Sequence, residues 1–180
     1  MNLPTGYTII ERLHGSGDGA AVRANDAGGE DVFLKTPVDA DRLWGEDQDT
    51  PKVEQRFEAA KVREQAAAAA QPEIFVSGRF ERSGKSVFWV RPFLQGTLRD
   101  WVDFKVVPGP GRLSAVCLAL IRGLATLVRL DGNGHGNLTL GNVLLHGKDN
   151  ATVRLVDPVE AEAAEVQSDK RALGLIIYQL

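Results

Sequence analysis

The sequence has a single cysteine, Cys117, so neither an intrachain disulfide nor a cysteine-based zinc site can form within the chain. It also lacks an excess of basic residues. The formal net charge is −3 and the isoelectric point is near 5.6, which argues against general nucleic-acid binding. No apolar run reaches the roughly 18 residues of a membrane span, and residues 1–19 lack the apolar core of a signal peptide. We therefore expect a soluble, cytoplasmic protein with no nucleic-acid or membrane partner.

What is present is the composition of an ordinary globular protein. Hydrophobic residues make up 43% and charged residues 25% of the 180 positions, which excludes disordered and fibrous architectures. A chain of this length forms one domain or two small lobes, and it can bury a core without disulfides or a structural metal.

The first half of the chain is dominated by short apolar and β-branched runs that are bounded by glycine-rich or polar turns. One long segment of strong helix formers interrupts these runs and ends before a proline. The predicted strands are 7–13, 20–25, 31–35, 74–80 and 86–93, and the predicted helix is 52–71.

The second half of the chain is predicted to be mainly helical. Thr97 is the expected N-cap of a short helix, and residues 113–130 form an apolar helix that we expect to be central and buried. Residues 143–146 and 152–156 predict a small hairpin, and residues 170–180 a final apolar helix. The order of these elements predicts the α+β class.

Two groups of polar and glycine residues fall between these elements. Gly15 and Gly17 lie in a turn between two predicted strands, and Lys35 ends the next strand. Such a turn lets backbone N–H groups approach phosphate oxygens, although a glycine-rich turn on its own is more often structural. The polar segment 135–142 follows the long apolar helix, and Asp157 ends the hairpin fifteen residues later.

In order and approximate spacing, these motifs match the signature set of protein kinases. The sequence resembles the eukaryotic-type Ser/Thr protein kinase superfamily, including its bacterial members, over residues 7–180. The resemblance implies a bilobal protein-kinase-like fold. Residues 1–93 would form an N-lobe of five antiparallel strands and one helix, and residues 94–180 a reduced, mainly helical C-lobe.

The resemblance also assigns roles to single residues. The implied nucleotide-binding positions are Gly15, Gly17, Lys35, Glu58, Val90, Phe93 and Leu145, and the implied magnesium ligands are Asn142 and Asp157. The helix glutamate that pairs with Lys35 is left open among Glu54, Glu58 and Glu64, with Glu58 favoured. Asp169 corresponds to the aspartate that braces the backbone of the catalytic loop.

The departures from the family bear on catalysis. Asn137 stands where the family has the aspartate that accepts the substrate proton, and a neutral amide cannot act as that base. Gly136 replaces the arginine that pairs with a phosphorylated loop. The metal-binding aspartate is followed by Pro158 and Val159 instead of phenylalanine and glycine, and the segment up to Asp169 is too short to dock a peptide substrate.

These features predict a degenerate, truncated pseudokinase that acts as a regulatory or scaffolding module and binds a partner protein. Residual binding of ATP and Mg²⁺ stays open, because Lys35, Asn142 and Asp157 favour it, whereas the altered glycine turn and Pro92 count against it. The alternative is an active minimal phosphotransferase that uses the same lysine, asparagine and aspartate with ATP and Mg²⁺.

A third class is a structural module whose nucleotide pocket is filled by side chains such as Trp89, Phe93 or Leu145. Because 180 residues are few for a kinase plan, we expect the lobe that recognises protein substrates to be cut short. The apolar final helix is then expected to be covered by a partner, by a second copy in a homo-oligomer, or by missing chain.

Overall fold

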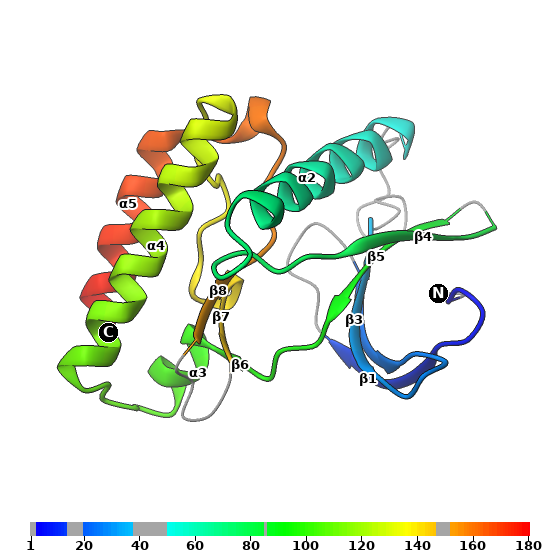
Figure 1. Cartoon of the computed structure of the whole chain (residues 1–180), viewed down its shortest axis with the longest axis horizontal. Coiled ribbons are helices and arrows are strands. Elements are labelled where there is room, and N and C mark those ends of the chain that lie inside the picture. Colours follow the sequence, from blue (N-terminus) through cyan, green and yellow to red (C-terminus); the bar gives the residue numbers. More distant parts are fainter. Residues whose placement is uncertain (1–2, 14–19, 38–49, 85, 147–151) are drawn as a thin grey trace. The chain divides into compact units, whose positions relative to one another are not determined.

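The computed structural model describes residues 3–13, 20–37, 50–84, 86–146 and 152–180. The predicted α+β class is confirmed, because a five-stranded antiparallel sheet and a small three-stranded sheet are combined with helices (Figure 1). The chain divides into two compact units. The first unit comprises Met1–Glu58 and Ser77–Phe93, and the second comprises Ala59–Val76 and Leu94–Leu180.

The first unit contains the five-stranded sheet. Its strands, in spatial order, are β1 (Thr8–Leu13), β2 (Ala20–Asn25), β3 (Asp31–Thr36), β5 (Ser86–Pro92) and β4 (Arg79–Ser83). Four of the five predicted strands are confirmed almost to the residue. The prediction for 74–80 is wrong in its bounds, since β4 begins at Arg79 and Phe75 instead forms a single parallel bridge with Leu155 of the second unit.

Strand β5 buries both of its faces, because successive side chains of a strand point to opposite sides of the sheet. Val87 and Trp89 pack with Phe57 of helix α2 (Thr50–Ala70) on one face. Phe88 and Val90 pack on the other face with apolar side chains of β2 and β3. The continuous apolar run Val87–Val90 therefore lies on an inner strand of the sheet.

The residues of helix α2 are mostly strong helix formers, with alanine at seven of its 21 positions and no internal glycine. The predicted helix 52–71 is confirmed to within two residues at either end. Its first part belongs to the first unit and its remainder to the second unit. Ala67 and Ala68 are buried in the core of the second unit, so the alanine run forms a closely packed helix face.

The second unit combines the small sheet with the remaining helices. Its elements are β6 (Gly96–Thr97), α3 (Leu98–Asp103), α4 (Pro110–Asp131), η1 (Leu140–Asn142), β7 (Val143–His146), β8 (Thr152–Leu155), η3 (Ala161–Ala163) and α5 (Val166–Gln179). The predicted N-cap is confirmed. The Thr97 hydroxyl accepts from the backbone N–H of Asp100 at 3.3 Å, and the Asp100 carboxylate accepts from the backbone N–H of Thr97 at 2.7 Å.

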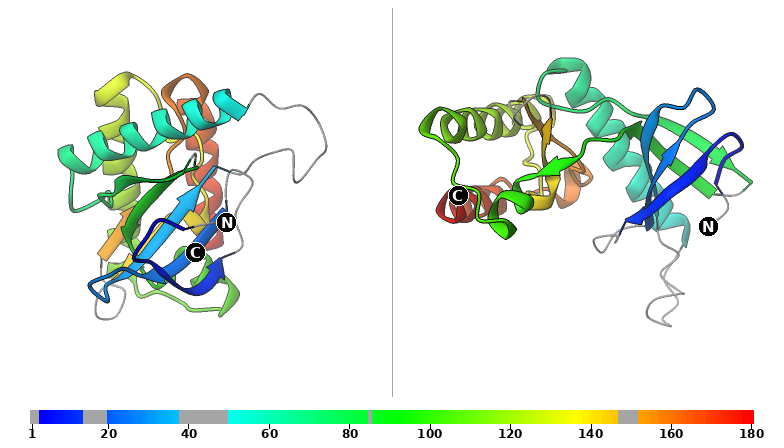
Figure 2. Two further views of the ribbon diagram at one scale, coloured as in Figure 1. Left: turned by 90° about the vertical axis from the view of Figure 1, so that its right-hand side faces the viewer. Right: turned by 90° about the horizontal axis from the view of Figure 1, so that it is seen from below.

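Helix α4 contradicts the prediction that it is buried. One stripe of residues at spacings of three and four, from Val116 through Leu120 to Leu127, packs into the core. On the rest of the helix, Leu118 and Ile121 are exposed at 49% and 53%. Helices α4 and α5 lie side by side (Figure 1, Figure 2), so α5 covers part of α4 and leaves the remainder of its apolar surface uncovered in this chain.

By length and composition, α4 could cross a membrane, and it is the one such helix in the described part of the chain. The expectation that no segment qualifies is therefore corrected. Because its buried stripe contacts β8 and α5, the same helix also serves as a packing element of the second unit. The structure is compatible with a soluble protein.

Candidate functional site

Among the described residues, four of the predicted site residues lie in the first unit: Lys35, Glu58, Val90 and Phe93. Lys35 is on β3, is only 5% exposed, and stands opposite Trp89 of β5 in the strand register. Val90 is paired with Leu34 on one side and with Arg79 on the other, so its backbone lies between two neighbouring strands. Trp89 is fully buried within the first unit.

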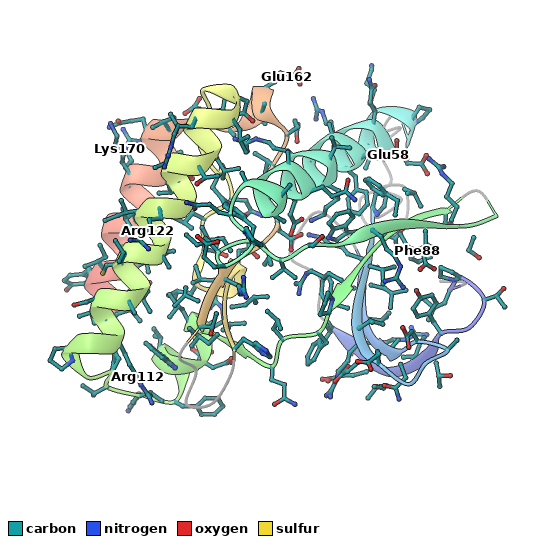
Figure 3. All side chains as sticks on the ribbon, in the orientation of Figure 1. Glu58, Phe88, Arg112, Arg122, Glu162 and Lys170 are labelled. Atoms are coloured by element: carbon teal, nitrogen blue, oxygen red, sulfur yellow. The ribbon has the colours of Figure 1, made fainter. Side chains whose placement is uncertain are left out.

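Glu58 and Phe93 have partners within the first unit. Glu58 lies near the N-terminal end of α2 (Figure 3), and its carboxylate accepts a hydrogen bond from Arg82 at 2.5 Å. The backbone N–H of Phe93 donates to the carbonyl of Asp31 at 3.0 Å, and its ring centroid lies 4.5 Å from the guanidinium carbon of Arg23. Gly15 and Gly17 lie outside the described residues.

The polar loop before β7 is held by Asp169 of α5. This carboxylate is buried and accepts hydrogen bonds from the backbone N–H groups of His135 and Gly136, the latter at 3.0 Å. The predicted bracing role of Asp169 is confirmed. Burial raises the pKa of Asp169 above its usual value, although the two N–H donors act in the opposite direction.

The second unit brings together three of the predicted site residues. The side-chain amide of Asn142 donates to the carbonyl of Asn137 at 2.8 Å, and the side-chain amide of Asn137 donates to the carbonyl of Asp157 at 3.3 Å. The carbonyl of Asn142 accepts from the backbone N–H of Val156 at 3.1 Å. Leu145, on the adjoining strand β7, is buried in the core of this unit. The base position, Asn137, is thus a hydrogen-bond donor tied into the loop.

Sequence reasoning missed Lys61, which lies on α2 in the second unit. Its ammonium donates to the carboxylate of Glu64 at 2.8 Å and to the carboxylate of Asp157. The side chains of Lys61, Glu64 and Asp157 are 3%, 0% and 10% exposed. Burial lowers the pKa of Lys61, but the two carboxylates outweigh that effect and hold the pKa above its usual value, so the ammonium is charged at neutral pH.

A second missed residue, Arg63, clamps the turn after α4. Its guanidinium binds both carboxylate oxygens of Asp131 and donates to the carbonyls of Asn133, Gly134 and Val159 at 3.1, 2.6 and 3.1 Å. Burial raises the pKa of Asp131, but the bonds from Arg63 and Asn133 outweigh it and hold the pKa below its usual value. One buried side chain therefore ties the turn after α4 to the segment that follows Asp157.

His135 is fully buried behind this loop, and its Nδ1 accepts the backbone N–H of Asn137 at 3.3 Å. Burial lowers the pKa of His135 to about 4, with the nearby Arg63 and Lys61 acting in the same direction and Asp157 opposing them. The ring is therefore neutral at pH 7 and serves packing and backbone hydrogen bonding.

We expect His135 to make the protein acid-sensitive. Because the unfolded chain binds a proton near pH 6.5 and the folded chain only near pH 4, the stability from this group is complete above pH 6.5 and is lost as the pH falls toward 4. The loss between pH 7 and pH 5 is about 2 kcal/mol, to be measured by urea unfolding at each pH. His135→Gln should flatten that dependence and the exposed His146→Gln should not. An NMR titration in which the His135 ring protonates near pH 6.5 would contradict the expectation.

Asn137 offers a neutral amide, and the carboxylate of Asp157 is bonded to Lys61. In the described part of the chain, no group of three or more histidine, cysteine or carboxylate side chains is placed to hold a metal ion.

Compared with known proteins, the chain matches no family model and no curated sequence.

Proposed function

We propose that the chain is a pseudokinase-type domain, with a kinase-like bilobal fold, that works in the cytoplasm by binding a partner protein and not by catalysis. The observation that supports this proposal most is the hydrogen bond of Asn137: at the position of the family's base, its neutral side-chain amide donates to the carbonyl of Asp157. Binding of ATP stays a prediction that depends on Lys35, which is buried on β3.

The chemistry of the loop supports the loss of catalysis. A base must accept the proton of the substrate hydroxyl, and such a group contributes about 10²- to 10⁴-fold to a rate. The side-chain nitrogen of Asn137 is a hydrogen-bond donor, and the side-chain nitrogen of Asn142 donates to the carbonyl of Asn137. Neither side chain carries a negative charge, so nothing in this pair can take the proton.

The surface of α4 and α5 supports partner binding. Exposed apolar side chains on these helices are Leu118, Ile121, Val128, Leu130, Leu175, Ile177 and Tyr178. The same two helices also carry exposed charged residues, such as Arg122 of α4 and Lys170 of α5 (Figure 3). A large apolar surface is uncommon on a monomeric protein and is typical of an interaction site.

Restoring the base tests the loss of catalysis. We expect neither the wild-type protein nor Asn137→Asp to transfer the γ-phosphate of ATP above the level of Lys35→Ala, because the Asp157 carboxylate stays bonded to Lys61 in all three. The measurement is transfer of radioactive phosphate to the protein itself and to a general acceptor. Activity that Asn137→Asp raises by about 10²-fold and Lys35→Ala abolishes would establish the phosphotransferase alternative.

The apolar surface can be tested on the isolated protein. We expect the wild type either to self-associate in size-exclusion chromatography with light scattering or to bind a fluorescent apolar probe. Replacing Leu175 and Tyr178, which are 63% and 89% exposed, by lysine should reduce both signals without loss of stability. Lys170→Ala, at an exposed charged position of the same helix, is the matched control. A wild-type monomer that binds no probe would count against a partner site here.

A further inference from the structure

The buried charges around Lys61 support an inference beyond the proposed function, which uses the bond between Lys61 and Asp157 alone. Lys61 and Glu64 are three positions apart on α2 and therefore share one helix face, and Asp157 follows β8 in the same unit. The ammonium nitrogen contacts Oε2 of Glu64 at 2.8 Å and Oδ1 of Asp157. Two carboxylates that are far apart in the sequence thus converge on one positively charged atom.

The kinase resemblance implies a magnesium ion on Asn142 and Asp157, and the described residues do not fit one. Mg²⁺ requires about six oxygen ligands, several of them water, whereas Asn142 and Asp157 are only 9% and 8% exposed. The Oδ1 atom of Asp157 is already bonded to a cation, Lys61. A divalent ion on this carboxylate would also face that ammonium at close range in a poorly solvated place, where like charges repel strongly.

We infer that the Lys61 ammonium is the built-in cation of this site: it pairs with both Asp157 and Glu64 from within the fold and takes the place of a divalent metal ion. Two buried carboxylates side by side need a positive partner, since an unpaired charge is costly to bury. Lys61 supplies that partner as part of the chain, so the second unit requires no metal to fold. This inference goes beyond the proposed function, because it holds whether or not the chain binds a partner.

Because both carboxylates contact Lys61, removing this lysine should allow a metal ion to bind between them. Oε2 of Glu64 and Oδ1 of Asp157 would then lose the ammonium that both contact, and carboxylate oxygens are the preferred ligands of Mn²⁺ and Mg²⁺. A metal ion could enter that space only once the ammonium is gone. The wild-type protein and a lysine-free variant should therefore respond to metal in opposite ways.

The experiment compares thermal unfolding of the wild type and of Lys61→Ala, each with EDTA and with Mn²⁺ at about 1 mM. We expect Mn²⁺ to leave the wild-type Tm unchanged and to raise the Tm of Lys61→Ala by about 5 °C, because the ion binds only the folded variant. The double variant Lys61→Ala/Asp157→Asn lacks one of the two carboxylates and should lose the response. A Lys61→Ala protein that folds and ignores Mn²⁺ would overturn the inference.

If Lys61→Ala does not fold, the inference can be tested on the wild-type protein alone, by NMR. Bound Mn²⁺ broadens the NMR signals of nearby amides, so equimolar Mn²⁺ should leave the amide signals of Asn142, Val156 and Asp157 sharp. Selective broadening of these three signals, absent from Asp157→Asn, would show that metal binds beside Lys61 and would overturn the inference.

Discussion

Replacing Arg63 by methionine should destabilise the protein by about 3–5 kcal/mol, which is the usual cost of breaking a buried ion pair by removing one partner. The Arg63 side chain is 6% exposed and its guanidinium binds the Asp131 carboxylate. Methionine would fill much of the volume, but the carbonyls of Asn133, Gly134 and Val159 would lose the guanidinium donor. The Asp131 carboxylate would lose its ion pair and keep the backbone N–H of Asn133. Urea unfolding followed by circular dichroism measures the loss.

Two further variants test whether the stability comes from the several N–H donors of the guanidinium and not from its charge alone. Arg63→Lys keeps the charge but offers a single ammonium, which cannot reach Asp131 and three carbonyls together, so most of the loss should persist. Arg56→Met, at an exposed arginine of the same helix, should change stability by less than about 0.5 kcal/mol. A loss below about 1 kcal/mol for Arg63→Met would mean that the clamp contributes little in solution.

The elements of the fold could be predicted because their signals are local. The bounds of β2, Ala20–Asn25, follow from apolar residues between turns, and the helix start at Thr97 follows from a capping pair three residues apart. The prediction for α4 was wrong because composition alone was used. Its apolar residues exceed one stripe, and only the stripe that includes Leu120 has a neighbour to pack against.

The clamp and the built-in cation could not be predicted, because their partners are far apart in the chain. Arg63 and Asp131 are 68 positions apart, and Lys61 and Asp157 are 96 positions apart. Charged residues on a helix usually face water, so helix propensity alone does not predict that these two cations are buried. The one available signal was the crowding of Lys61, Arg63 and Glu64 between alanines that form a packed face.

For the predicted site residues, too, the local contacts could be predicted and the distant one could not. Asn137 and Asn142 are five positions apart, and the structure joins them by a hydrogen bond. Asp157 joins them through its backbone carbonyl, whereas its side chain bonds Lys61. A motif therefore predicted which residues would meet, but the partner that decides the chemistry of the carboxylate came from a helix that no motif covers.

Replacing Gly136 by alanine is expected to cost about 3 kcal/mol, although this residue seemed from the sequence to be only a lost arginine. Its φ is +73°, which L-residues rarely adopt, and a Cβ there would lie 2.9 Å from Cα of Ala164 and collide with Val159. A strained backbone and an overpacked contact each cost about 1–3 kcal/mol. Equilibrium unfolding of Gly136→Ala measures the loss, and Gly136→Arg should be worse and should not restore catalysis.

Gly132 provides the matched control for this prediction. Its φ is +82°, so alanine there has the same backbone strain, but nothing lies within 4 Å of the added Cβ. Gly132→Ala should therefore cost only about 1 kcal/mol, and the difference between the two variants isolates the collision with Val159 and Ala164. Equal losses would mean that the loop moves to accept a side chain. A larger loss at Gly136 would mean that the packing against Val159 and Ala164, in the segment before α5, and not the absence of a phosphorylated loop, is what requires glycine at this position.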